Sequence, residues 1–107
     1  MRKYLFILFF VAPLLFAGCK FIEVTPEAEK VRVLEANEVT QCKRLGKTTV
    51  SVMARAGIVE RKGEKVEKEL ADLARNSAAE MGGDTIVPMT DIQDGKRTFA
   101  VYRCINP

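Results

Sequence analysis

Three cysteines are the residues of this sequence whose chemistry depends most on their position. Cys19 directly follows the small residues Ala17 and Gly18, whereas Cys42 and Cys104 stand far apart in the rest of the chain. The sequence contains no histidine, so the commonest general base and the commonest zinc ligand are both missing. The chemistry open to these thiols is therefore acylation, disulfide formation, redox exchange or metal binding.

Residues 1–18 predict a secretory signal peptide. Arg2 and Lys3 give a positive start, residues 4–16 are apolar, and Ala17-Gly18 supplies the small residues that a signal peptidase accepts. The apolar run is shorter than the roughly 20 residues that span a bilayer, so an uncleaved membrane anchor is the weaker interpretation.

Cys19 is the predicted lipidation site. The stretch Leu15-Phe16-Ala17-Gly18-Cys19 resembles the lipobox of bacterial lipoproteins, in which the cysteine carries diacylglycerol and palmitate and becomes the mature N-terminus. Phe16 stands where a lipobox most often has Leu. Each buried methylene contributes about 0.8 kcal/mol, so two or more chains would anchor the protein permanently. The alternative is an ordinary secretory signal that happens to precede a cysteine.

The residues after Cys19 predict the membrane to which the protein is sorted and a tether to the domain. An Asp after the acylated cysteine marks retention at the inner membrane in enterobacteria, so Lys20 favours the outer membrane, with the domain facing the periplasm. Residues 19–30 predict the acylated N-terminus and a short tether that reaches roughly 35–40 Å when extended. Residues 31–107 are then long enough for one small domain.

Cys42 and Cys104 predict a disulfide, because they are the two thiols left in a chain exported to an oxidising compartment. Such a bond closes a loop of about sixty residues, which stabilises a fold by around 4 kcal/mol in the chain-entropy estimate. A redox-active pair and a metal site are the alternatives. A redox pair is usually close in sequence, however, and two thiolates without histidine make half a zinc site.

No other residues form a recognisable catalytic motif. Ser51 and Ser77 lack the sequence context of a nucleophile, so both are interpreted as structural. Turn and cap chemistry explains Asp84 and Asp94 without calcium binding or acid catalysis, although Asp91 could join them on one side of a hairpin. We expect a protein that is not an enzyme and binds no metal, cofactor or small-molecule substrate.

The charge balance argues against nucleic acid as a partner. The whole chain has 17 basic and 14 acidic residues, but Arg2 and Lys3 belong to the leader, which leaves 15 basic residues in the mature chain. Charges alternate in sign through residues 60–69 and form no basic stripe.

Hydrophobic periodicity predicts a small α+β fold with a mainly antiparallel sheet. Alternating residues predict strands at 31–33 and 49–53, each with one buried face, and a loop over 39–47. The longest periodic segment, 64–81, predicts an amphipathic helix that packs on the sheet and ends at Gly82-Gly83. Its apolar stripe comprises Val66, Leu70, Leu73, Ala74, Ser77, Ala78 and Met81, whereas the charged residues, among them Asp72, lie mostly away from it.

Two further strands complete the predicted order of strand, strand, helix, strand, strand. One starts at residues 85–87 and extends toward Ile92, with Pro88 marking an edge or a bulge. Asp94-Gly95 predicts a tight hairpin. The return strand, 97–104, is apolar on both faces and is the best candidate for a central strand.

Three short motifs resemble those of the YajI-type enterobacterial lipoproteins, a family of unknown function. These are residues 39–47 (VTQCKRLGK), 78–87 (AAEMGGDTIV) and 100–104 (AVYRC). Asp84 stands where that family commonly has Asn. The chain is also remotely similar to RcsF, an outer-membrane lipoprotein that reports envelope stress, but it lacks the second cysteine pair and the long Pro-rich tether.

The sequence therefore favours a lipid-anchored envelope protein whose small domain contacts another envelope protein. An envelope-stress sensor similar to RcsF is the alternative, and a cryptic hydrolase or redox enzyme is the least favoured.

Overall fold

The computed structural model describes residues 22–53, 55–56, 59–60 and 63–107. The predicted signal peptide (1–18) and the predicted lipidation site, Cys19, lie outside the described residues. Within the part that is described, no helix is long and apolar enough to cross a membrane.

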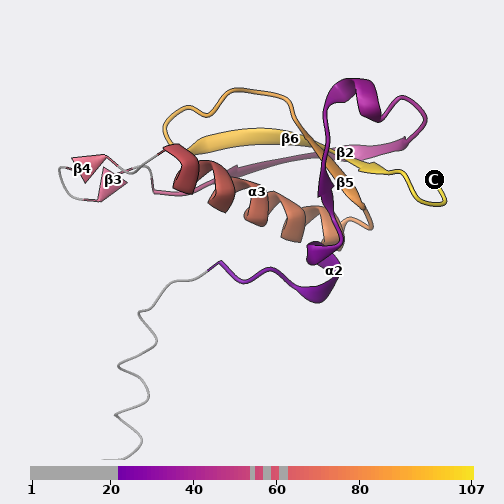
Figure 1. The fold of residues 1–107 in the computed structure, drawn as a ribbon, viewed down its shortest axis with the longest axis horizontal. Coiled ribbons are helices and arrows are strands. Elements are labelled where there is room, and N and C mark those ends of the chain that lie inside the picture. Colours follow the sequence, from indigo (N-terminus) through magenta and orange to yellow (C-terminus); the bar gives the residue numbers. More distant parts are fainter. Residues whose placement is uncertain (1–21, 54, 57–58, 61–62) are drawn as a thin grey trace, which may run out of the picture.

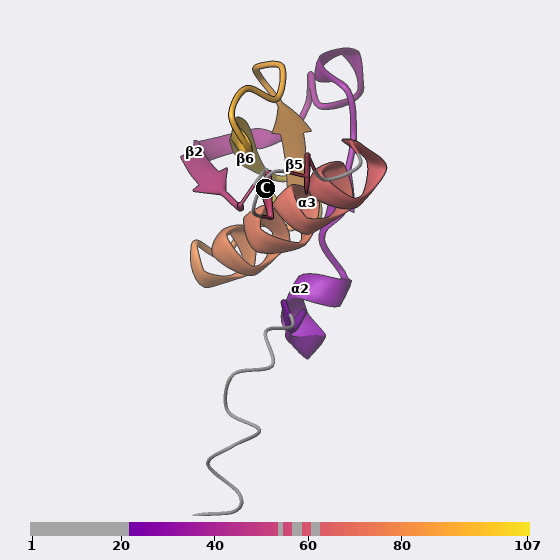
Figure 2. The ribbon, with the colours of Figure 1, turned by 90° about the vertical axis from the view of Figure 1, so that its left-hand side faces the viewer.

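A four-stranded sheet forms one layer, and one long helix covers one of its faces (Figures 1 and 2). Its strands are β1 (Arg32–Val33), β2 (Lys43–Ser51), β5 (Thr85–Pro88) and β6 (Lys96–Arg103), in the order β1-β5-β6-β2. β1 and β5 are parallel, and the other two pairings are antiparallel. The predicted α+β fold with a mainly antiparallel sheet is confirmed.

The last strand is central, as predicted, because β6 lies between β5 and β2. The tight turn before it is also confirmed: Gln93 and Lys96 exchange backbone hydrogen bonds of 3.1 and 2.9 Å. Asp94 and Gly95 between them have φ of +52° and +70°. Both values lie in the left-handed region that tight hairpins require, which is why Asp and Gly occupy these positions.

Pro88 ends β5, which stops short of the strand predicted toward Ile92. β5 is an inner strand of the sheet and not an edge strand. Its neighbour β1 pairs only with Thr85 and Ile86, so Pro88 lies past the end of β1, and no strand of the described residues pairs with it on that side. A residue without an N–H is tolerated at such a place.

The first strand is shorter than predicted and buries one valine where two were expected. Val31 is buried, whereas the side chain of Val33 is 48% exposed. β1 has two residues and stands at the edge of the sheet, so no further strand of the described chain lies beside Val33 on its outer side.

β2 begins at Lys43, so the loop predicted over 39–47 is wrong for its second half. The sequence pattern does not predict this part of the strand, because the exposed residues Lys43, Arg44 and Lys47 interrupt the apolar alternation. β2 is an edge strand with one covered face, and such strands tolerate charged residues. A bulge between Arg44 and Gly46 also shifts its register against β6.

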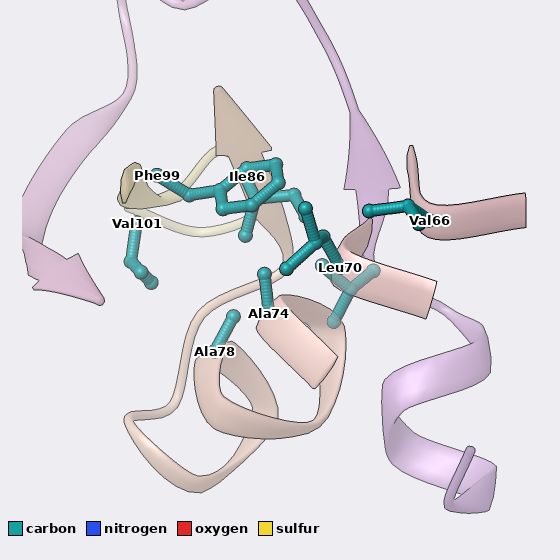
Figure 3. Packing of buried hydrophobic residues seen from close by; sticks show 8 residues of the cluster. Val66, Leu70, Ala74, Ala78, Ile86, Phe99 and Val101 are labelled. Carbon is teal, nitrogen blue, oxygen red and sulfur yellow. The ribbon is translucent and has the colours of Figure 1, made fainter. Parts of the chain in front are cut away.

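The helix α3 (Gly63–Glu80) confirms the predicted amphipathic helix. Leu70, Ala74 and Ala78 point from α3 toward the sheet residues Ile86, Phe99 and Val101 (Figure 3). The buried cluster consists of these six residues with Val31 and Val66. Leu73 and Ser77 are half-buried, and Met81 is 37% exposed, so the apolar stripe is narrower than predicted.

Gly82 and Gly83 form the predicted end of the helix. The Gly83 N–H donates to the Ala78 carbonyl at 2.8 Å, and the Gly82 N–H donates to the Ala79 carbonyl at 3.0 Å. With φ of +82° at Gly82, this is a Schellman motif, which satisfies the last carbonyls of a helix.

Asp72 is buried, contrary to the prediction that the charged residues of the helix lie away from its packed side. It pairs with Lys68 at 2.8 Å and with Arg75 at 3.3 Å. Arg75 also donates to the carbonyls of Glu29 and Val31 at 2.8 and 3.0 Å. The acid is buried because the chain before β1 lies across this side of α3.

Residues 23–31, called the N-terminal arm below, pack on α3, so most of the predicted tether is folded. The arm contains the short helix α2 (Pro26–Glu29), which is capped by the Thr25 side chain. Ala28 is fully buried. Asn76 fixes the start of the arm, because it donates to the Glu23 carbonyl at 2.7 Å and accepts from the Thr25 N–H at 3.1 Å.

One 3-10 helix and one two-stranded sheet complete the described chain. The 3-10 helix η1 (Ala36–Glu38) lies in the connection from β1 to β2, and Val39 after it packs on Val87 and Ala100, on the sheet face away from α3. β3 (Arg55–Ala56) and β4 (Val59–Glu60) pair with each other, and both belong to the segment of the chain that connects β2 to α3.

Candidate functional site at the disulfide end of the sheet

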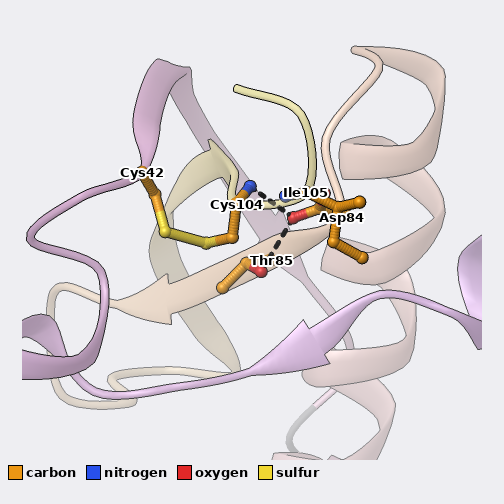
Figure 4. The surroundings of a disulfide bond; sticks show 5 residues. All are labelled: Cys42, Asp84, Thr85, Cys104 and Ile105. Carbon is orange, nitrogen blue, oxygen red and sulfur yellow. Dashed lines mark hydrogen bonds between the residues drawn. A yellow bond between two sulfur atoms is a disulfide. The ribbon is translucent and has the colours of Figure 1, made fainter.

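The disulfide between Cys42 and Cys104 is formed, as predicted, with an S–S distance of 2.08 Å (Figure 4). Cys42 directly precedes β2, and Cys104 directly follows β6. The two residues extend the pairing of Lys43 with Arg103, so the bond closes the end of the β2–β6 ladder. It links positions that are 62 residues apart in sequence.

Asp84 holds the chain on the other side of Cys104. Its carboxylate accepts hydrogen bonds from the backbone N–H of Cys104 at 2.8 Å and of Ile105 at 2.9 Å (Figure 4). The Thr85 hydroxyl donates to the same carboxylate at 2.9 Å. The end of β6 is therefore held by a covalent bond and by an ionic side chain from the loop after α3.

These contacts determine the ionisation of Asp84. Burial of the carboxyl raises its pKa, but the N–H groups of Cys104 and Ile105, the Thr85 hydroxyl and the charge of Arg32 lower it by more. The net result is a pKa below the ordinary value of 3.8, because every one of these donors and charges favours the carboxylate form.

The disulfide lies against a small apolar cluster on the sheet face away from α3. Val39, Val87 and Ala100 are buried there, and Leu34, Tyr102 and both cysteines pack around them. The connection that holds η1 thus covers Val87 of β5 and Ala100 of β6 on this face, and the disulfide joins the end of the connection to the end of β6.

The two serines take different positions, neither of them in a catalytic arrangement. Ser77 on α3 forms a hydrogen bond of 2.8 Å with the Thr48 hydroxyl of β2 and thereby links helix and sheet. Ser51 is exposed at the end of β2.

The three acidic residues singled out from the sequence do not form one cluster, because Asp84 lies apart from Asp91 and Asp94. Asp84 lies at the disulfide end of the sheet, Asp94 is in the hairpin turn, and Asp91 is exposed near that turn. Among the described residues, no group of His, Cys, Asp and Glu could hold a metal ion. A shallow hollow of about 460 Å³ beside the hairpin includes both Asp91 and Asp94, with Thr90, Gln93, Lys96, Arg97 and Thr98.

Sequence reasoning missed an exposed basic surface on β2 and β6, on the side away from α3. We call it the open face. Thr48, Val50 and Val52 pack toward α3, so the residues that alternate with them face the other way. On β2 and β6 the open face consists of Arg44, Lys47, Thr49, Ser51, Lys96 and Thr98.

The open face is polar and ordered by its own contacts. The hydroxyls of Thr49 and Thr98 are 2.8 Å apart across the ladder. The Arg44 guanidinium donates to the Met89 sulfur at 3.8 Å. The sequence signal for this surface was the run of basic and hydroxyl residues from Lys43 to Ser51, which could have been read as one face of an edge strand.

A protein-family model described as a domain of unknown function, DUF4156, matches residues 22–104. The matched range begins just before the N-terminal arm and ends at the second cysteine of the disulfide. No curated protein and no solved structure matches this chain.

Proposed function

This chain belongs to the DUF4156 family of domains of unknown function, and from that premise we propose that it is an outer-membrane lipoprotein whose domain is a non-enzymatic protein-interaction module in the periplasm. We further propose that it is related to the short YajI-type lipoproteins, because three motifs distributed over the whole domain resemble theirs in the same order.

The disulfide supports the export of this chain. A half-buried bond between Cys42 and Cys104 is stable in an oxidising compartment and is rare in the cytosol. The lipobox-like stretch that ends at Cys19 accounts for the third thiol, since acylation consumes it. Each cysteine thus has one use in the same exported protein.

The N-terminal arm shortens the distance between the domain and the proposed lipid. Ile22 is the third residue after Cys19, and three extended residues span about 10 Å. Because the arm from Glu23 onward is held on α3, the domain is kept beside the membrane surface. Such a short link favours a partner that is itself at the membrane.

The observation that carries the interaction role is the open face. It is the part of the sheet that neither α3 nor the η1 connection covers, and one end of its two strands is fastened by the disulfide and by Asp84. A solvated sheet face with its strands held in this way suits recognition of another protein, because little conformational entropy is lost when a preordered surface binds.

Photocrosslinking in living cells tests this proposal. A benzophenone amino acid placed at Lys96 on the open face, or at Glu67 on the exposed side of α3, should yield a discrete crosslinked band from the outer-membrane fraction. Absence of crosslinks from both positions, together with recovery of the protein in the cytosol, would contradict the proposal.

A further inference from the structure

Among the residues that the structure describes, the outer edge of β2 presents backbone groups without a strand partner. The Thr98 carbonyl accepts from the Met89 N–H at 2.9 Å, on the β5 side of β6. Thr98 and its register partner Thr49 are therefore a pair without mutual backbone hydrogen bonds, and the N–H and C=O of Thr49 point away from β6.

The same argument applies to the residues on either side. Lys96 exchanges its backbone hydrogen bonds with Gln93, so its partner Ser51 also points its N–H and C=O outward. Lys47 follows by alternation, because it lies two residues before Thr49. In the part of the chain that the structure describes, no strand pairs with this edge.

The strands beside this edge carry only positive charges. β2 contains Lys43, Arg44 and Lys47, β6 contains Lys96, Arg97 and Arg103, and neither has an acidic residue. None of these six forms an ion pair with a carboxylate among the described residues. An incoming strand would thus meet a positive field with free backbone donors and acceptors.

Charged side chains on an edge strand can have a different role, which is to prevent that strand from pairing with another chain. The edge of β2 lacks the other devices that do so. The bulge lies before Lys47, and from there to Ser51 the strand pairs regularly with β6 and contains no proline. Lys47 is the only charged residue in that stretch.

A second copy of this chain fits the edge poorly. Pairing β2 with another β2 would bring together two edges that each carry Lys43, Arg44 and Lys47 and no acidic residue, and the repulsion between these like charges disfavours such a pair. The lipid headgroups of the protein's own membrane fit poorly too, since the N-terminal arm lies on the helix side of the sheet, opposite the open face (Figure 2).

We propose that the β2 edge at Lys47, Thr49 and Ser51 binds an extended, acidic segment of a partner protein as a fifth strand. Backbone hydrogen bonds supply affinity in this mode, and side chains of alternate residues supply specificity. Glutamate or aspartate side chains on the open side of the added strand would meet Lys47, Arg44 and Lys96. This inference rests on the proposed interaction role and specifies its surface.

The test uses the full protein purified from membranes in detergent and a synthetic peptide in which Glu and Val alternate. Amide exchange should slow at Lys47, Thr49 and Ser51 when the peptide is added. A peptide methylated on the backbone nitrogens that face β2, with unchanged charge, should bind about tenfold more weakly or worse, because it cannot donate to the edge.

Variants give a second readout. Lys47→Glu should weaken peptide binding at least tenfold, whereas the matched control Lys65→Glu on the exposed side of α3 should leave it unchanged. Thr49→Pro removes an N–H that points to solvent, so it should preserve the fold and abolish binding. If Thr49→Pro fails to fold, the methylated peptide still decides the question.

Equal binding of the methylated and unmethylated peptides, or protection confined to other amides, would overturn the inference. Crosslinks in cells from Glu67 without peptide protection at β2 would refute the edge site and leave the interaction role standing. Loss of the interaction role itself would show as an absence of crosslinks from every surface.

Discussion

The carboxylate of Asp84 holds the backbone N–H of Cys104 at 2.8 Å, so the cysteine that closes the sheet by its disulfide is also fixed through its main chain. Asp84 is the last residue of the loop from α3 into β5, and its own N–H donates to the Tyr102 carbonyl at 2.9 Å. One residue therefore links the end of the helix to the end of β6.

Asp84→Asn should destabilise the domain. An amide has one acceptor oxygen where the carboxylate uses two for Cys104 and Ile105, and its NH₂ group would face a backbone N–H. We expect a loss of about 1–3 kcal/mol in the free energy of unfolding, measured in urea. Asp91→Asn, at an exposed position, should change stability by less than about 0.5 kcal/mol. Equal effects of the two substitutions would contradict this role of Asp84.

Asp84 should also make stability depend on acid pH. Its pKa is lower in the folded protein than the ordinary 3.8, so its stabilising contribution is complete above that value and is lost as the pH falls through the folded pKa. Melting temperatures measured between pH 6 and pH 2 should fall more steeply for the native protein than for Asp84→Asn. Parallel curves would show that this carboxyl does not contribute.

Replacement of Cys42 and Cys104 by serine should cost about 4 kcal/mol, because the bond closes a loop with a sequence separation of 62 residues. That cost is a large share of the 5–15 kcal/mol of a typical domain. Denaturant unfolding of the native protein with and without reductant should reproduce the difference. If reductant leaves the stability unchanged while both thiols become free, the disulfide is not a structural support.

The Gly83→Ala variant should be less stable than the native protein, because the added methyl group crowds the neighbouring residues. A Cβ at this position would lie 2.5 Å from the Val101 Cγ1 and 3.1 Å from the Tyr102 carbonyl oxygen. We expect a loss of about 1–3 kcal/mol. Gly63→Ala is the matched control, because nothing lies within 4 Å of a Cβ built there. Thermal denaturation of both variants compares them, and equal melting temperatures would show that the Gly83 contact does not constrain the fold.

The parts of the fold that the sequence predicts well are those whose signal is local. The helix α3 extends over 18 residues with a regular apolar stripe, and Asp94-Gly95 has the turn residues that a tight hairpin needs. The disulfide was predictable because, once Cys19 is assigned to acylation, the two remaining cysteines allow a single pairing.

The parts that could not be predicted depend on tertiary neighbours. β2 is a strand because β6 pairs with it, although Lys43, Arg44 and Lys47 break its alternation. Asp72 is buried because the N-terminal arm lies across α3, and no pattern within the helix reveals that contact. The same arm was interpreted as a tether, since α2 is too short to be recognised from its sequence.

The candidate site shows the same division. The sequence identified Cys42 and Cys104, but it explained Asp84 as a turn residue and did not reveal that its carboxylate binds the chain after β6. The open face was missed because its residues come from two strands that are about fifty positions apart and become neighbours only in the sheet.

Intact-mass measurement of the protein purified from its cells, before and after reduction, reports the use of all three cysteines at once. We expect a chain that begins at Cys19 with added diacylglycerol and palmitate, and a gain of two hydrogens when the bond between Cys42 and Cys104 is reduced. A mass that corresponds to residues 1–107 without lipid, unchanged by reductant, would contradict this expectation.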